Sequence, residues 1–226
     1  MRYLKALLYG VYAGLAIGLG SLVFTVISTY FTSTFGMVLA SALFSIGLIL
    51  VCTLGLQLYT GKVGVVFDGP DRKEIARNAI CLPIMLAGNA IGAFGLGLLC
   101  YVLFRDIPEL STRIVAISEG KFTSDTVFLQ GLFCGALVYI AVYFYKNLNN
   151  FAMKIIGIIT AVTLFVYCGF QHCIANMFYF GMAFNWDIRM LWNLLAVILT
   201  NSVGALLVRC IVYLAGSLQN KKEENK

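Results

Sequence analysis

Charged residues divide the chain into long apolar segments. No Asp, Glu, Lys or Arg occurs over 6–61, 78–104, 126–145, 155–186 or 190–208. A helix that crosses a bilayer needs roughly 20 apolar residues, so each segment can hold at least one crossing. The first segment can hold two, because the polar stretch 29–36 interrupts it. The pattern therefore predicts an all-α integral membrane protein with six transmembrane helices.

The composition agrees with lipid as the solvent for most of the chain. Hydrophobic residues make up 61% of the 226 residues and charged residues 12%, whereas soluble domains have about 45–50% and about 25%. This balance disfavours a cytosolic enzyme, a disulfide-stapled secreted domain and a nucleic-acid-binding protein. The apolar stretch after residue 5 is too long for the core of a cleaved signal peptide, so we expect an uncleaved first helix.

The distribution of Lys and Arg predicts the orientation in the membrane. With six crossings, twelve of the 16 cationic residues fall on the side of both termini, and the other four are Arg105, Arg113, Lys121 and Arg189. By the positive-inside rule both termini are cytoplasmic. Residues 1–226 are expected to form a single transmembrane domain, with residues 216–226 as a cytoplasmic tail. The net charge of +6 is then mainly a consequence of topology.

The chain also matches itself at one offset. Asn89-Ala-Ile-Gly92 matches Asn201-Ser-Val-Gly204 after 112 residues, and the same offset relates Thr60 to His172. These matches predict two repeats, over about 5–104 and about 122–215. Three crossings in each repeat would invert the second copy relative to the first, an arrangement typical of transporters and channels.

Polar side chains interrupt the second and fifth predicted helices at membrane depth. They are Gln57, Thr60 and Gly61 in the second helix and Gly169, Gln171, His172 and Asn176 in the fifth. Irregular backbone survives there only where it is buried in protein or lines a cavity, so we expect both helices to be broken and to meet at one path. Thr60 and His172 can donate hydrogen bonds, and neither break contains Asp or Glu. The pattern favours an anion or a weak acid over a cation.

Other interpretations stay open at this point. A lone histidine in an apolar helix is more often a packing residue than a mechanistic one. A membrane enzyme or electron carrier would need metal or redox ligands; the seven cysteines fit small packing residues, and Cys168, His172 and Cys173 have no further ligand nearby in sequence. No cofactor or metal is therefore predicted. A non-transporting structural subunit of a membrane complex would not require two polar breaks.

Several phrases of the sequence resemble the formate/nitrite transporter family. Residues 169–177 (GFQHCIANM) are similar to the signature of its fifth helix, and residues 58–61 (LYTG) to its second-helix phrase Leu-Phe-Thr-Gly/Ser. Residues 88–92 (GNAIG) and 201–204 (NSVG) are similar to its third and sixth helices, and the glycine pattern over 10–20 to its first. The resemblance extends from about residue 5 to about residue 214.

The resemblance implies a homopentamer of six-helix, aquaporin-like protomers in the lipid bilayer of a prokaryotic inner (cytoplasmic) membrane. Each protomer would have its own pore for small monovalent anions or their conjugate acids, formate or nitrite first and hydrosulfide as an alternative, with no enzymatic activity. The resemblance assigns the central histidine to His172, the loop threonine to Thr60 and a further pathway position to Asn176. It assigns vestibule lysines to Lys5 and to Lys121, in the loop before the fourth helix, and apolar constrictions to Phe44, Leu48, Tyr59 and Phe165.

Two departures from the family bear on the site. Lys62 stands where the family has Asn or a small polar residue, so it either adds positive charge near the inner mouth or extends to the interface. Gly135 stands where many members have Asn, which predicts a weaker polar contact in the fourth helix. A bare anion in a dry apolar constriction costs on the order of several kcal/mol. We therefore hypothesise that Thr60 and His172 bind the anion and help it to take up or lose a proton.

Overall fold

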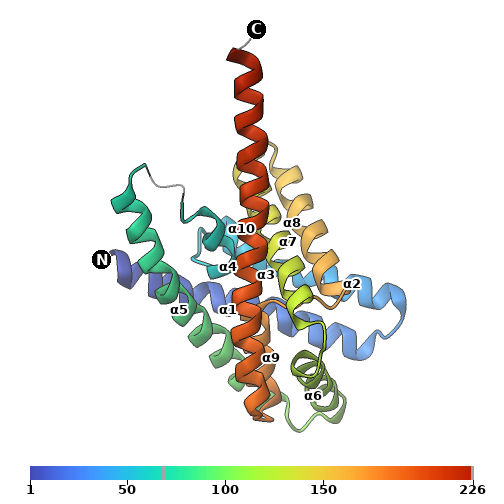
Figure 1. Ribbon diagram of the computed structural model, residues 1–226. Coiled ribbons are helices and arrows are strands. Elements are labelled where there is room, and N and C mark those ends of the chain that lie inside the picture. The colour runs from blue at the N-terminus through green and yellow to red at the C-terminus, as the bar shows by residue number, and fades with distance from the viewer. Residues whose placement is uncertain (68–69, 225–226) are drawn as a thin grey trace.

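The computed structural model describes residues 1–67 and 70–224, with side chains up to residue 215 (Figure 1). Within these ranges the backbone is helical and contains no strand. The elements are α1 (Arg2–Tyr30), α2 (Thr34–Phe44), α3 (Ile46–Thr53), α4 (Tyr59–Lys62), the 3-10 turn η1 (Val63–Val65), α5 (Arg72–Phe104), α6 (Pro108–Phe122), α7 (Val127–Asn147), α8 (Phe151–Tyr167), α9 (Cys173–Ala183) and α10 (Ile188–Glu224).

Five stretches of the described residues are long and apolar enough to cross a membrane. They are α1, the α2–α3 pair over Thr34–Thr53, α5, α7 and the part of α10 over Ile188–Ala215. Helices α8 and α9 have 17 and 11 residues and are each shorter than a full crossing. They fall within the apolar segment 155–186 and its flank, with the interruption at 168–172 between them. A sixth crossing made from these two helices stays a prediction.

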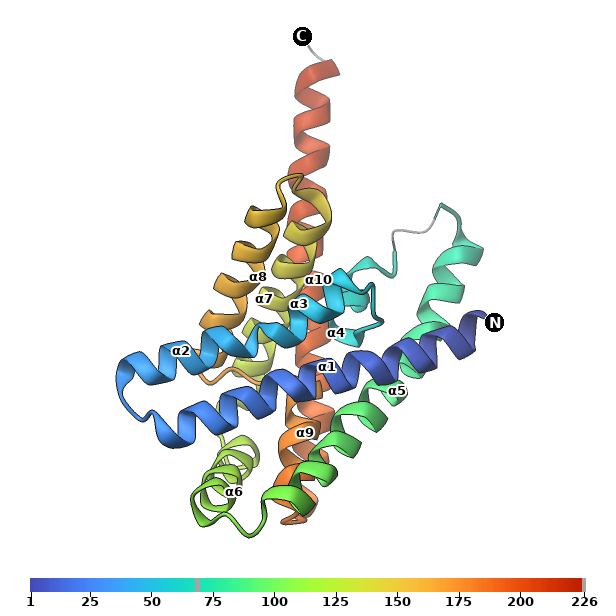
Figure 2. The same ribbon diagram turned by 180° about the vertical axis from the view of Figure 1, so that it is seen from behind.

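Two helix pairs approach each other at glycines. Figure 2 shows α1 and α5 side by side, and α7 packs along α10 in the same way. A Cβ atom at Gly14 of α1 would overlap the carbonyl oxygen of Asn89, and one at Gly135 of α7 would overlap that of Asn201. Gly135 is therefore a close-packing position, where a side chain would not fit, and the weaker polar contact expected there stays a prediction. Small residues at such crossings let helix backbones touch in a membrane protein.

Helix α9 lies at the centre of the molecule. All of its eleven residues are buried, and it contacts α1, α5, α6 and α10. A helix that is apolar on every side is stable only when neighbours cover every side. The N-terminal end of α9, next to the interruption at 168–172, is consequently enclosed by protein.

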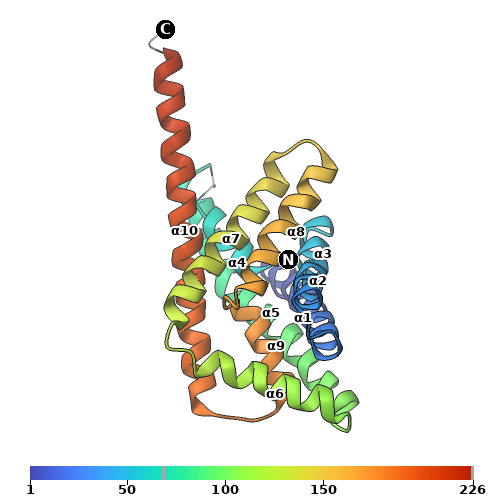
Figure 3. The same ribbon diagram turned by 90° about the vertical axis from the view of Figure 1, so that its right-hand side faces the viewer.

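Helix α6 occupies the segment that the sequence analysis left as a loop, and Lys121 lies in its last turn. Pro108 stands at the start of the helix, where its missing N–H is not needed. Leu110, Ile114 and Ser118 recur every four residues and are buried, which gives α6 one covered face. Figure 3 shows α6 lying across the end of the molecule at which α9 finishes.

The predicted tail is helical for most of its length. Helix α10 continues as far as Glu224, beyond the other helices (Figure 1), and residues 225–226 lie outside the described residues. The seven cysteines are free thiols. Cys81, Cys100, Cys134 and Cys173 are buried and Cys52 is half-buried, whereas Cys168 and Cys210 are exposed in the single chain, so a packing role for these two stays a prediction.

Candidate functional site

The two interruptions have the same backbone geometry. Gly55 and Gly169 both adopt the left-handed conformation, with φ of 65° and 71°, which favours glycine because a side chain would clash with the backbone. In each interruption the next residue closes the turn with a backbone hydrogen bond of 2.9 Å, Leu56 N–H to Val51 O in one and Phe170 N–H to Phe165 O in the other. Each pair of equivalent residues is 114 apart.

The equal offset of 112 residues does not explain why Thr60 faces His172. An offset of 112 relates Asn89 to Asn201, whereas the interruptions are related by 114, because the second half has two fewer residues between interruption and asparagine. The counterpart of Thr60 is therefore Ile174, and that of His172 is Leu58. Thr60 and His172 do contact each other as predicted, but not because they are equivalent residues of the two repeats. Thr60 and His172 meet because the two interruptions face each other.

Asn201 holds the interruption before α9. Its side-chain oxygen accepts the Cys173 N–H at 3.0 Å, and its Nδ2 donates to the carbonyl oxygens of Gly131 at 2.8 Å and Gln171 at 2.9 Å. The side chain is fully buried. Irregular backbone in an apolar medium needs such partners, since an unpaired peptide group costs free energy there.

Asn89 does the same for the interruption before α4. It accepts the Tyr59 N–H at 2.8 Å and donates to the carbonyl oxygens of Gly10 at 2.8 Å and Gln57 at 2.9 Å. The contacts of Asn89 and Asn201 thus match one for one, which relates α1 to α7 by an offset of 121 residues (Gly10 to Gly131). Each half of the molecule thus uses one asparagine, with the same three hydrogen bonds, to support its interruption.

Thr60 and His172 form a buried hydrogen-bonded pair. Their Oγ1 and Nε2 atoms are 2.9 Å apart, and the two residues are 0% and 3% exposed. The Nδ1 atom of His172 accepts the Ala175 N–H at 3.3 Å as the cap of α9. Because Nδ1 is an acceptor, the proton of the neutral ring belongs on Nε2, which then donates to Thr60. The hydroxyl proton of Thr60 is left free to bind an acceptor.

His172 forms part of a cavity of about 300 Å³, here named the Lys121 cavity. Phe44 and Phe165 also line it, with their rings edge to face and the centroids 5.8 Å apart; the ring of His172 lies 6.1 Å from that of Phe165. Arg113 and Lys121 supply positive charge, and no described Asp or Glu lines the cavity. Two aromatic rings, the histidine and two cations thus meet in one space.

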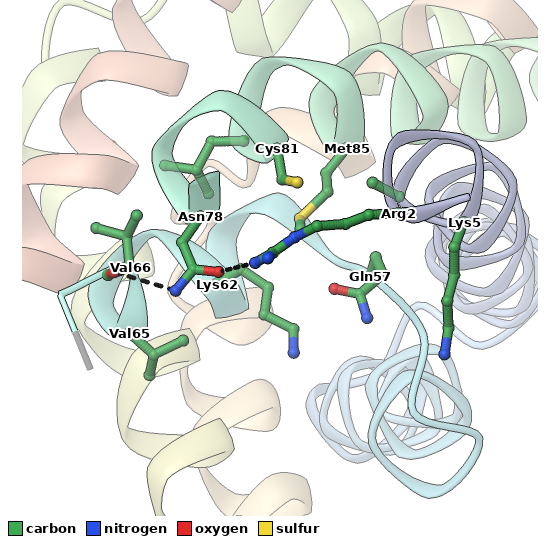
Figure 4. A pocket seen from close by; sticks show the side chains of 11 residues that line it. Arg2, Lys5, Gln57, Lys62, Val65, Val66, Asn78, Cys81 and Met85 are labelled. Carbon is green, nitrogen blue, oxygen red and sulfur yellow. Dashed lines mark hydrogen bonds between the residues drawn. The ribbon is translucent and has the colours of Figure 1, made fainter. Parts of the chain in front are cut away.

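A second cavity, of about 340 Å³, is here named the Lys62 cavity (Figure 4). Lys62 and Lys5 line it together with Gln57 and Arg2, and its described lining contains no acid. Arg2 is held at the wall by Glu74 at 2.8 Å and by Asn78 at 2.6 Å. Lys62, two residues after Thr60 in α4, lines this cavity, whereas His172, the hydrogen-bond partner of Thr60, lines the Lys121 cavity.

The other predicted residues are distributed unevenly between these spaces. Lys5 lies at the Lys62 cavity, with its Nζ 5.1 Å from the centre of the Tyr9 ring. Leu48 is buried in the core, and Tyr59 is half-buried with its hydroxyl 2.8 Å from that of Ser202. Neither Leu48 nor Tyr59 is among the described residues that line the two cavities.

Asn176 lines the Lys121 cavity, and its amide also belongs to a hydrogen-bonded network, in which its buried Oδ1 has no partner among the described residues. Its Nδ2 donates to Gln171 at 2.8 Å and Asn193 at 2.9 Å. Gln171 donates in turn to Gln130 at 2.8 Å and to the carbonyl oxygen of Lys121 at 3.0 Å. Gln130 and Asn193 were not among the residues predicted for the site. Each is a polar residue in a charge-free segment, the signal that identified Gln171.

Lys121 is half-buried in the last turn of α6. Its Nζ lies 6.0 Å from the centre of the Tyr179 ring, and no described acid forms an ion pair with it. Burial lowers the pKa of Lys121 to about 8, because a desolvated ammonium is less stable than a neutral amine. Arg113 was counted only for topology in the sequence analysis, yet it provides the second cation of the Lys121 cavity.

Comparison with known proteins identifies the family. The family model described as formate/nitrite transporter matches residues 1–215. This chain belongs to the formate/nitrite transporter family. The uncharacterized transporter YrhG of Bacillus subtilis (strain 168) is 30% identical over 202 residues, covering 83% of this chain and 74% of YrhG. A protein of Methanothermobacter thermautotrophicus named "Probable formate transporter" is 28% identical over 198 residues, covering 76% and 72%.

Further relatives agree with this membership. The nitrite transporter NirC of Escherichia coli (strain K12) is 26% identical over 176 residues, covering 76% of this chain and 65% of NirC. A solved structure described as a pentameric formate channel with formate bound has a TM-score of 0.82 and 26% identity, covering 96% of this chain and 98% of that one. The relatives are transporters and channels, so this family member is a multi-pass membrane protein and not an enzyme.

Proposed function

We propose that the protein is a channel for small monovalent anions or their conjugate acids. One observation carries the proposal: the buried Thr60–His172 hydrogen bond joins α4, whose Lys62 lines one cavity, to His172, which lines the other, and the described residues of both linings include cations and no acid. Positive charge at both mouths raises the local concentration of anions and lowers that of cations. A pore for cations would instead present carboxylates or rings of carbonyl oxygens.

In this proposal the Lys62 cavity is the inner mouth and the Lys121 cavity the outer one, with both termini cytoplasmic. An anion enters past Lys5, accepts the Thr60 hydroxyl proton at the centre and passes the ring pair of Phe44 and Phe165. A hydrogen bond from a neutral donor to an ionised acceptor is worth about 1.5–3 kcal/mol. That gain offsets part of the cost of leaving water between the two cavities.

Proton exchange at His172 is the finer part of the proposal. To become an imidazolium, His172 must carry a proton on Nδ1, where it now accepts the Ala175 N–H. Protonation therefore breaks this bond and places a charge in a buried site. An anion held at Thr60 supplies the opposite charge, so the histidine gains a proton only while the site is occupied and can then pass one to the anion.

Formate and nitrite are the first candidates for the substrate, and hydrosulfide is the alternative within the family. The relatives described above as formate and nitrite transporters support the first two. We further propose six crossings with α8 and α9 as the fifth, a homopentamer with one pore in each protomer, and the inner membrane of a prokaryote as the location. The pentameric description of the similar formate channel supports the assembly.

The test is uptake into liposomes that contain the purified protein. Formate, nitrite and hydrosulfide salts are each supplied outside, and protein-free liposomes give the background. Uptake of formate or nitrite well above background supports the proposal, and uptake of hydrosulfide alone favours the alternative substrate. Absence of flux for all three contradicts it and favours a structural subunit. His172→Gln keeps a donor towards Thr60, so an unchanged pH profile in that variant would exclude proton exchange at the histidine.

A further inference from the structure

In the polar network beside α9, the side-chain amide of Gln171 is fully hydrogen-bonded. Gln171 uses both of its amide hydrogens, towards Gln130 and the Lys121 carbonyl oxygen, and its Oε1 accepts from Asn176 and Asn193, each at 2.8 Å. Four side chains from four different parts of the chain thus fill this space. No capacity of the Gln171 amide is left for a ligand.

The matching contacts of the two halves identify the counterparts of these four residues. The interruptions are related by 114 residues, so Gln171 corresponds to Gln57 and Asn176 to Lys62. Asn89 corresponds to Asn201 at 112 residues, so Asn193 of α10 corresponds to Cys81 of α5. Gly10 corresponds to Gly131 at 121 residues, so Gln130 of α7 corresponds to Tyr9 of α1. The four amide side chains of one half are therefore replaced, at the equivalent positions of the other half, by a glutamine, a lysine, a thiol and a phenol.

These replacements leave the inner half open. Cys81 is shorter than Asn193 and a much weaker hydrogen-bonding group, and the ring of Tyr9 lies under the Lys5 ammonium. The side-chain amide of Gln57 has no partner among the described residues, and the counterpart of the filled network is the Lys62 cavity of about 340 Å³. Figure 4 shows Gln57, Lys62 and Cys81 around this one space, with Lys5 beside it.

Lys62 brings a charge into this open space. It is half-buried, and no described Asp or Glu forms an ion pair with it. The neighbouring guanidinium of Arg2 already forms an ion pair with Glu74 at 2.8 Å. Arg2 therefore has its own counterion, and as a second cation it cannot balance the charge of Lys62. A partly desolvated cation without a partner is unfavourable, and a bound anion removes that penalty.

We propose that Gln57 and Lys62 form an anion-binding site in the Lys62 cavity, which holds the anion before it reaches Thr60. The site suits a small carboxylate or oxyanion, because one oxygen can accept from the Lys62 ammonium and the other from the Gln57 amide. This inference rests on the proposed function and adds to it a binding station at the position that the amide network occupies in the other half. Lys5 lies nearer the mouth and assists capture.

The first test compares Lys62→Met with Lys73→Met. Lys73 is an exposed lysine at the start of α5 outside the cavity, so the control removes the same charge. Formate is the probe. Its binding to the detergent-solubilised protein is measured by the shift in thermal unfolding, with gluconate as an anion too large for the site. We expect Lys62→Met to raise the half-saturating formate concentration about tenfold or more, as befits a lost charge-assisted hydrogen bond, while Lys73→Met stays near wild type. Equal values for Lys62→Met and wild type would overturn the proposal.

The second test closes the site without touching a charge. Cys81→Asn installs the counterpart of Asn193, which can pair with Gln57, and Cys81→Ala is its control. We expect weaker formate binding only in Cys81→Asn, and unchanged binding in both would contradict the counterpart argument. The outcomes separate this inference from the proposed function. Wild-type liposomes that transport formate with the same half-saturating concentration in Lys62→Met reject the inference alone, whereas absence of wild-type flux rejects the proposed function.

Discussion

Asn201→Ala removes the support of the interruption before α9 while leaving Thr60 and His172 unchanged. The truncated side chain no longer accepts the Cys173 N–H or donates to the carbonyl oxygens of Gln171 and Gly131. Cys173 is the first residue of α9 and follows His172 directly. Loss of this hydrogen bond therefore frees the backbone that positions the histidine.

The magnitude follows from the groups that lose their partners. The site is fully buried, so water cannot replace the asparagine without opening the α7–α10 contact. The Gly131 carbonyl keeps its bond within α7 and loses little. The Cys173 N–H and the Gln171 carbonyl lose their side-chain partner, and at about 1–2 kcal/mol for each buried unpaired group the variant is destabilised by about 2–4 kcal/mol.

The assay is denaturant unfolding of the purified protein in detergent, combined with formate flux in liposomes. Asn147→Ala is the matched control, because Asn147 is exposed and donates one bond, to the Tyr143 carbonyl oxygen at 2.7 Å; we expect a change within about 0.5 kcal/mol for such a surface substitution. Asn201→Ala should lose both stability and flux. A stability within the same range as the control would refute the conclusion that Asn201 supports the interruption.

Two further predictions concern packing and pH. Gly135→Ala should lower thermal stability, because its Cβ would overlap the Asn201 carbonyl oxygen, whereas Gly95→Ala has open space at its Cβ and should not; equal unfolding temperatures would contradict the close-packing role. Lys121 is charged below a pKa of about 8 and neutral above it, so the rate of formate uptake through the outer mouth should fall as the pH rises from 7 to 9, while formate itself stays ionised. Lys121→Gln should remove this dependence, and a variant that keeps the wild-type pH slope would assign it to another group.

The positions of both interruptions could be predicted from polarity alone. Polar residues such as Gln57 and Gln171 in charge-free segments are costly in lipid, so they usually face the protein interior or a cavity. The glycines with positive φ, Gly55 and Gly169, stand beside them. What the sequence could not provide is the register of the two halves. Three offsets, for α1 with α7, the interruptions and α5 with α10, differ because the connecting segments differ in length.

The hydrogen-bond partners also required the structure. Asn193 and Gln130 lie far from Gln171 along the chain, and their contact with it depends on how α7 and α10 are rotated. Helix α6 was missed because its sequence is polar and only one face is covered. The predicted constriction residues lie in different places, which also depends on how the helices are rotated. Phe44 and Phe165 meet at a cavity, while the Tyr59 hydroxyl contacts Ser202 of α10.

We propose above that an anion binds to the Thr60 hydroxyl on its way between the two cavities. The most direct test is formate flux at pH 7 in liposomes containing wild type, Thr60→Val or Thr160→Val, the last a threonine on the exposed face of α8. We expect the flux through Thr60→Val to be about tenfold or more below wild type, as for a lost hydrogen bond to a charged group, and the flux through Thr160→Val to match wild type. Wild-type flux in Thr60→Val would contradict it.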